Sequence, residues 1–137
     1  MKILPVVCRV LLGLMFVVFG ANIMHSFLPV PPQVPGTAAV DWGNIMMASH
    51  WMKVVGFFQF LAGVLLLVGG TAPLGLVILA PIIVNVLCFH MFLTGGQGIG
   101  AGVFVGVLEV LLVYFYRASF AGIFSTKAKP VIKGQVV

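Results

Sequence analysis

The segment from Ala62 to His90 constrains the fold more than any other part of the chain. It consists of two apolar runs joined by a Gly-Gly-Thr-Ala-Pro turn, and no ionised side chain interrupts it before the histidine. Hydrocarbon offers no hydrogen-bond partner to a backbone N–H or C=O, so apolar runs of this length can satisfy their backbone only as helices. Gly69, Gly70 and Pro73 are residue types that reverse a chain between two helices. The segment therefore predicts a transmembrane helical hairpin.

The composition of the whole chain agrees with a membrane location. Of its 137 residues, 62% are hydrophobic and 7% are charged, which lies outside the range of soluble globular proteins. The formal net charge is +5, but the basic residues lie at the ends of apolar runs and not among exposed aromatic side chains. We therefore expect the chain to contact a lipid bilayer and not to bind nucleic acid.

The apolar runs predict the number of membrane spans. Each run is about as long as a helix that crosses the hydrocarbon core. The predicted fold is an all-α membrane protein, a four-transmembrane-helix bundle with a Pro-rich external segment between helices 1 and 2. The four spans are expected at residues 5–24, 52–70, 74–93 and 101–117.

The Pro-rich segment separates the first two predicted spans. Its prolines exclude a regular helix over the first half of residues 25–51, so we expect an extended lid on the mouth of the bundle. Asp41 is the expected N-cap of a helix that begins near Trp42 and continues into the second span. The residues that break the helix are Pro29, Pro31, Pro32, Pro35 and Gly36.

Basic residues predict the orientation. Lys2 and Arg9 flank the N-terminus, four further basic residues follow the last apolar run, and Lys53 alone lies at the opposite face. The positive-inside rule therefore predicts a multi-pass protein of a bacterial inner (cytoplasmic) membrane, with both termini cytoplasmic. We expect residues 1–124 to form the transmembrane domain and residues 125–137 a flexible, basic cytoplasmic tail near anionic lipid.

Four polar side chains within the apolar runs are candidate site residues. A rise of about 1.5 Å per residue places three of them, one on each of the last three spans, at a similar depth. A charged glutamate costs about 2.5 to 3.5 kcal/mol in hydrocarbon unless it is paired or protonated, so we expect Glu109 to pair with Arg9. Two interpretations stay open: a buried clasp that fixes helix register, and a ligand or proton site. The predicted cluster is Arg9, Gln59, Asn85 and Glu109.

Three histidines from different segments are expected at the external mouth, surrounded by methionines. Imidazole and thioether groups suit copper, and three imidazoles could equally hold zinc or hydrogen-bond a quinone carbonyl. Their spacing is not that of a metal motif. Three interpretations therefore stay open: interfacial histidines with hydrated tips, a metal site, and hydrogen bonding to a ligand or partner. The residues are His25, His50 and His90, and they are only weak candidates as metal ligands.

Four segments, in this order and with the Pro-rich segment after the first, resemble the DoxX family of small four-helix membrane proteins: residues 9–22, 65–74, 81–93 and 108–117. The resemblance covers nearly the whole chain up to about Phe120. It departs from the family at Gln59, where relatives often have a glutamate, and a neutral amide cannot carry a proton. The positions that match the family pattern are Arg9, Gly13, Gly20, Gly63, Pro73, Asn85, His90, Glu109 and Arg117.

Members of the DoxX family are described as membrane subunits of thiosulfate:quinone oxidoreductase or as partners of thiol-stress enzymes. The resemblance implies an accessory or quinone-interacting subunit of a membrane oxidoreductase assembly. It would have other membrane subunits as partners, a lipid-soluble quinone as ligand and no intrinsic cofactor. The chain has no haem-attachment motif, flavin fingerprint or nucleophile elbow, so we do not expect catalysis by the chain alone. The alternatives are a purely structural subunit and a small-ligand or copper-handling protein that uses the external His/Met mouth.

Overall fold

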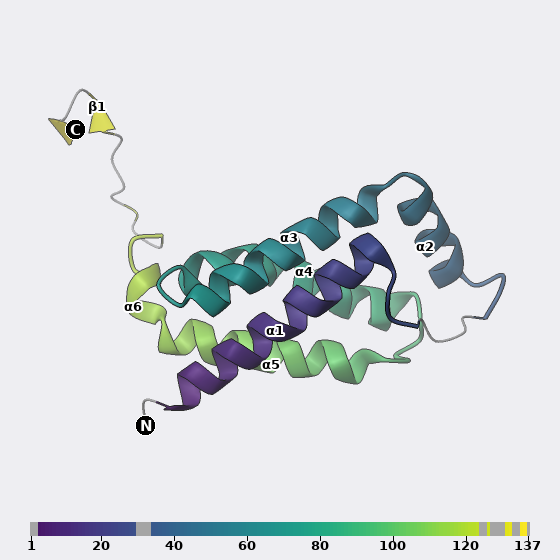
Figure 1. Ribbon diagram of the computed structural model, residues 1–137, viewed down its shortest axis with the longest axis horizontal. Helices are drawn as coiled ribbons and strands as arrows, with labels where there is room; N and C mark the ends of the chain where they lie inside the picture. The colour runs from purple at the N-terminus through teal and green to yellow at the C-terminus, as the bar shows by residue number, and fades with distance from the viewer. Residues whose placement is uncertain (1–2, 30–33, 124–125, 127–130, 133–134, 137) are drawn as a thin grey trace.

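The computed structural model describes residues 3–29, 34–123, 126, 131–132 and 135–136. Regular structure in these residues is helical apart from two short strands, Val131–Ile132 (β1) and Gln135–Val136 (β2), which pair antiparallel. The predicted all-α class is therefore confirmed for the body of the chain. The helices are α1 (Ile3–His25), α2 (Ala38–Ala48), α3 (Trp51–Val68), α4 (Ala72–Phe92), α5 (Ile99–Phe115) and α6 (Arg117–Phe120) (Figure 1).

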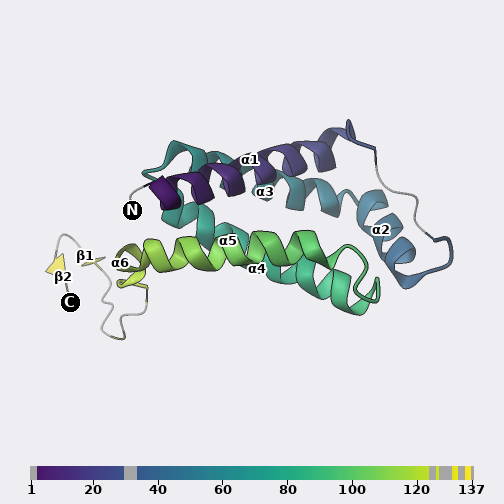
Figure 2. The same cartoon turned by 90° about the horizontal axis from the view of Figure 1, so that it is seen from below.

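The four long helices pack side by side. Each of α1, α3, α4 and α5 packs against the next, and α1 against α5 closes the ring. Successive helices run in opposite directions (Figures 1 and 2). We call the end that carries α2 the outer end, and the end where α1 begins and α6 lies the inner end.

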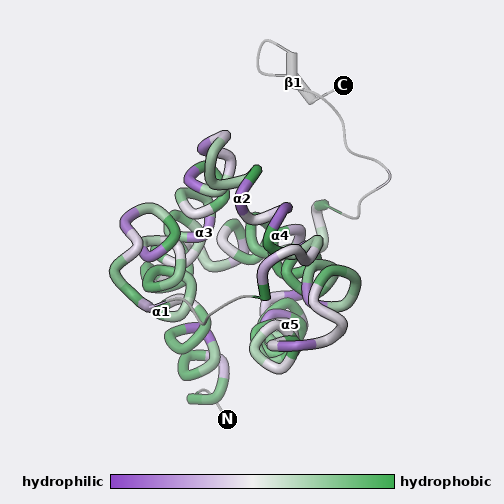
Figure 3. The backbone as a smooth tube through the Cα atoms, turned by 90° about the vertical axis from the view of Figure 1, so that its right-hand side faces the viewer, coloured by the Kyte–Doolittle hydropathy of each residue, from purple (hydrophilic) through white to green (hydrophobic). Residues whose placement is uncertain are grey.

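The long helices are apolar on their outward faces as well as in their interior. α1, α3 and α4 are each long and apolar enough to cross a membrane, and α5 is a shorter apolar helix of 17 residues. Viewed along the bundle, all four helices are largely hydrophobic in Figure 3. Soluble monomers rarely expose such continuous apolar surface, so the helices indicate a bilayer environment. Examples of exposed side chains are Val18, Phe58, Val84 and Val110.

The predicted hairpin is present as α3 and α4. Gly69 ends α3 with φ +87°, a conformation that favours glycine, and a proline lies in the first turn of α4. The hydroxyl of Thr71 donates to the carbonyl of Leu65 at 2.8 Å. This bond satisfies one of the four carbonyls that a helix leaves free at its C-terminus.

The connection between α1 and α3 differs from the prediction. α2 begins at Ala38 with Thr37 as its N-cap, so Asp41 lies in the first turn and is not the cap. α2 also does not continue into α3, because His50 adopts a left-handed conformation with φ +61° that interrupts the helix. No helix forms in the described residues 26–29 and 34–37. The prolines at positions 31 and 32 lie outside the described residues, as does most of the predicted tail at 125–137.

Glycines set the distance between α1 and α3. A methyl group built on Gly20 would lie 2.6 Å from the carbonyl oxygen of Gly56, and one built on Gly63 would lie 2.7 Å from that of Gly13. Both distances are shorter than any van der Waals contact. The two backbones therefore touch directly, as in membrane helix pairs with small interfacial residues.

Candidate functional site

The four residues of the predicted polar cluster do not come together. Gln59 and Glu109 are each 5% exposed and lie in the interior. Arg9 is half-buried near the inner end, and Asn85 is exposed on the outer surface of α4. Gln59 and Glu109 are therefore buried in the bundle as a cluster requires, whereas Arg9 and Asn85 are not.

Arg9 binds the C-terminal end of α3. Its Nη1 donates to the carbonyl oxygen of Leu66 at 3.0 Å, and its guanidinium lies beside Gly69, where a side chain would overlap it. A cation at a helix C-terminus is favourable because free carbonyls and the helix dipole place partial negative charge there. The Nε of Arg9 is buried and has no partner in the described residues. Arg9 therefore acts as a cap for α3.

Glu109 has no such partner. Both carboxylate oxygens expose less than 1 Å² and form no hydrogen bond with the described residues. The predicted ion pair with Arg9 is therefore wrong. A physical reason is that side chains lean toward the N-terminus of their own helix. α1 begins at the inner end of the bundle and α5 begins at the outer end. The side chain of Arg9 therefore leans toward the inner end, and that of Glu109 leans toward the outer end.

Asn85 faces away from the bundle because the buried stripe of α4 runs along its other side. That stripe includes Leu76, Leu79 and Ile83. At about 100° per residue, Asn85 lies roughly 200° around the helix from Ile83. Asn85 is therefore not part of a buried cluster with Gln59 and Glu109.

Asn85 instead lines a groove between α2 and α4 at the outer end, with a volume of about 180 Å³. The ring of Trp42, from α2, lies 4.9 Å from the ring of Phe89, from α4, with their planes tilted by 47°. An amide, a thiol and aromatic faces thus line one concave surface. We call it the outer groove; its residues are Trp42, Asn85, Cys88, Phe89, Phe92 and Leu93.

Sequence reasoning assigned no binding role to the other five residues of the outer groove. One signal was present: the positions 85, 88, 89 and 92 follow the i, i+3, i+4, i+7 spacing of a single helix face. The spacing alone could not reveal that α2 folds back over this face. Trp42 was named only as the residue near which a helix was expected to begin.

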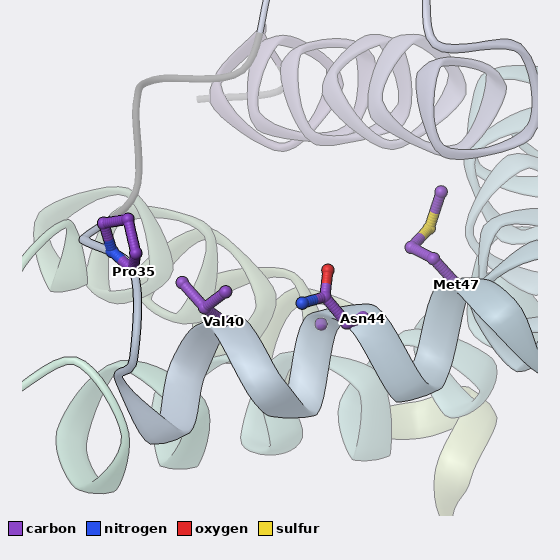
Figure 4. Close-up of a pocket in the computed structure, with 5 residues that line it drawn as sticks. Pro35, Val40, Asn44 and Met47 are labelled. Carbon is purple, nitrogen blue, oxygen red and sulfur yellow. The ribbon is translucent and has the colours of Figure 1, made fainter.

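A second concavity lies on α2 itself. Val40, Asn44 and Met47 project from the same side of the helix, and Pro35 closes one end (Figure 4). Its volume is about 320 Å³. Of the described residues, α2 and the segment just before it line this concavity, and none of these lining side chains is aromatic or charged. The outer groove is therefore the better ligand candidate, because two helices and a stacked aromatic pair define it.

The three histidines have separate environments. His25 ends α1 and His50 precedes α3, and both are exposed. His90 is half-buried, and its Nδ1 lies 2.7 Å from the carbonyl oxygen of Gln97. A carbonyl can only accept, so Nδ1 carries the hydrogen. Within the described residues, which include all three histidines, no three His, Cys, Asp or Glu side chains are close enough together to hold a metal ion.

The two cysteines are also separate. Cys8 is buried on α1 and Cys88 is exposed on α4 within the outer groove, and both are free thiols.

Comparisons with known proteins identify a relative. No protein-family model matches the chain, and no solved structure matches it. The Uncharacterized protein YwoB of Bacillus subtilis (strain 168) is 33% identical over 143 aligned residues, which cover 99% of this chain and 90% of the relative. With this identity across almost the full length of both sequences, the chain belongs to the same protein family as YwoB of Bacillus subtilis.

Proposed function

We propose that the chain is a four-span protein of the bacterial inner membrane, with both termini in the cytoplasm. The 17 residues of α5 correspond to about 25 Å of helix, which is at the lower limit for crossing the hydrocarbon core. Arg9 and Arg117 lie at the inner end, whereas Lys53 lies at the outer end. The positive-inside rule supports this orientation.

We propose further that the protein interacts with a quinone as an accessory subunit of a membrane oxidoreductase assembly. The observation that carries this proposal is the outer groove. A quinone head group is a flat ring with carbonyl acceptors. The Trp42 and Phe89 rings offer aromatic faces for such a ring, and the Asn85 amide offers a donor for one carbonyl.

The size of the outer groove supports a ring and not a larger ligand. Its volume of about 180 Å³ is below the range of about 300 to 1,000 Å³ that is typical for drug-sized ligands. An isoprenoid tail would remain in the lipid beside α4. The resemblance to the DoxX family supplies the redox context, and we assign the source of electrons to a partner subunit.

A fluorescence titration tests the proposal, because the chain contains two tryptophans. In a Trp51→Phe variant the remaining emission comes from Trp42, inside the groove. A short-chain quinone added to the detergent-solubilised protein should quench this emission to a plateau. Asn85→Leu in the same background should weaken binding about fivefold to tenfold, as expected for the loss of one hydrogen bond of about 1 kcal/mol.

Asn44→Leu is the matched control, since Asn44 is also an exposed amide at the outer end but lies in the other concavity. This variant should bind like the Trp51→Phe parent. Quenching that rises linearly without a plateau, and to the same extent in the Asn85→Leu variant, would indicate random collision in the micelle. That result would rule out the outer groove as a quinone site.

A further inference from the structure

We propose that Glu109 is an internal proton-binding site, which holds a proton as a neutral carboxylic acid in the packed bundle. This inference is independent of the outer groove. It rests on the burial of Glu109, on the absence of a hydrogen-bond partner among the described residues and on the engagement of Arg9 and Arg117 with other groups.

The carboxyl group is enclosed by apolar packing. Glu109 lies on the same buried stripe of α5 as Val105, Leu108 and Leu112, which belong to the hydrophobic core. Each of its oxygens exposes less than 1 Å², so a water-sized sphere does not reach them. An organic ligand has no more room there than water has, and the described residues place no three His, Cys, Asp or Glu side chains together to coordinate a metal ion. A proton is therefore the ligand that this packing can accommodate.

An ionised carboxylate at this position would need a compensating cation. The helices packed against α5 are α1, α4 and α6. Their ionisable side chains are Cys8, Arg9 and His25 on α1, Cys88 and His90 on α4, and Arg117 on α6. The histidines lie at the outer end of their helices, and Cys8 is a buried thiol.

The two arginines are engaged elsewhere. Arg9 donates to Leu66 at the end of α3, and Arg117 donates to the Tyr114 carbonyl and stacks on the Tyr114 ring at 4.6 Å.

Contacts of two glycines indicate the height of Glu109 along the bundle. Gly106 packs against Ile83, and Gly75 packs against Ala62 and Leu66. Followed from α5 to α4 and from α4 to α3, these contacts place Glu109 at about the same height along the bundle as Gln59. That height is about two helical turns, or ~10 Å, from Leu66, the residue that Arg9 binds. The protonated form is thus the one that this packing stabilises.

Stability does not account for a carboxyl group here. A neutral acid without a hydrogen-bond partner loses its bonds to water on burial and gains none in return. A leucine would fill the site without this cost. Ionisable groups that a membrane protein retains at such a cost are functional candidates. The gain or loss of a proton is the chemistry that a carboxyl group can supply and a leucine cannot.

Infrared spectroscopy tests the proposal directly. The difference spectrum between the wild type and Glu109→Gln at neutral pH should contain the carbonyl band of a protonated carboxylic acid. This band should shift in heavy water, as an exchangeable O–H requires. A difference spectrum with ionised carboxylate bands would overturn the proposal. An acid band that never shifts in heavy water would also overturn it, because a proton that cannot exchange is not a bound ligand.

Chemical labelling provides a second measurement, because the chain has two acidic side chains. A hydrophobic carbodiimide reacts with protonated carboxyl groups in apolar surroundings. It should label Glu109 during transient local opening of the bundle, since the packed site leaves it no room. A water-soluble carbodiimide should label the exposed Asp41. Labelling of Glu109 by the water-soluble reagent alone would contradict the proposal.

A thermal melt separates a proton site from a structural role. Glu109→Leu should melt at a higher temperature than the wild type and should lack the acid band. If Glu109→Leu instead melted at a much lower temperature, a structural partner would be holding the carboxylate, and the proposal would be wrong.

Discussion

At the scale of single residues, Arg9 shows how a charge is accommodated inside an apolar bundle. Its guanidinium binds the end of another helix, and the carboxyl group of Glu109 stays without a hydrogen-bond partner among the described residues. The free carbonyls at the end of α3 already carry partial negative charge. A cation there gains a partner without a second buried ion. The hydrogen bond joins residues 57 positions apart, so Arg9 also connects α1 to the hairpin.

The capping role predicts a graded loss of stability. Arg9→Met should lower the free energy of unfolding by about 1 to 3 kcal/mol, as expected for losing a charged hydrogen bond at a helix end. Arg9→Lys should lose less, because it keeps the charge but has a different donor geometry. Melts in detergent measure both. Equal losses in the two variants would show that the charge at this position contributes nothing.

Adjacent glycines offer a matched test of the same site. Gly69→Ala should cost about 1 to 2 kcal/mol, because alanine is strained in the left-handed region. It should also displace the Arg9 guanidinium, which occupies the space that the new methyl group would need. A methyl group on Gly70 would have nothing within 4 Å of it, so Gly70→Ala should change stability by less than about 0.5 kcal/mol. Similar losses in both variants would contradict the assigned geometry.

At the scale of helices, the pair α1 and α3 depends on backbone contact. Gly13, Gly20, Gly56 and Gly63 let the two helices approach until a single methyl group would overlap the opposite backbone. Such an approach creates many small dispersion contacts and requires no polar side chains. The backbones of α1 and α3 therefore approach each other most closely at these glycines.

An added methyl group should separate α1 from α3. Gly20→Ala should destabilise the bundle by about 1 to 3 kcal/mol, the usual cost of overpacking a close contact. Gly100→Ala, in the first turn of α5, is the control because its new methyl group would have nothing within 4 Å of it. That variant should be neutral or stabilising by up to about 1 kcal/mol, since alanine favours a helix more than glycine does. Thermal melts of both variants on one preparation would check the contrast, and a neutral Gly20→Ala would contradict direct backbone contact.

At the scale of the whole molecule, the number of spans determines which side each loop faces. Four crossings place α6 on the side opposite the α2–α3 connection, whereas three crossings would place them on the same side. Ser49 and Ser119 are exposed on these two segments, and serine is close to cysteine in size.

Thiol labelling of intact cells distinguishes the two topologies. In a background of Cys8→Ala and Cys88→Ala, an impermeant reagent should label Ser49→Cys and leave Ser119→Cys unlabelled until the cells are broken. The reason is the proposed orientation, with α2 outside and α6 inside. Labelling of both variants in intact cells would mean that α5 does not cross the membrane.

The fold was more predictable from the sequence than the site. Apolar runs predicted the boundaries of the long helices to within two residues, because length and hydrophobicity decide where a chain can cross a bilayer. They could not give the orientation of Asn85. A helix that is apolar on all sides has no hydrophobic periodicity to mark its inner face. The separation of α2 from α3 was also hidden, because it depends on the left-handed conformation of His50, which a histidine does not signal as clearly as a glycine would.

The closing contact between α1 and α5 has a consequence for biogenesis. α5 is the last of the long helices to leave the ribosome, and until it arrives the surfaces of α1 and α4 that it covers remain open. Glu109, which lies on α5, therefore need not enter bare lipid, where a charged group would cost about 2.5 to 3.5 kcal/mol. It can pass from the insertion machinery directly into the space between α1 and α4, which protein already lines on both sides. In a chain that stopped after α4, the surfaces of α1 and α4 that α5 covers would face lipid. The cap that Arg9 forms on α3 does not involve α5 and would still be present.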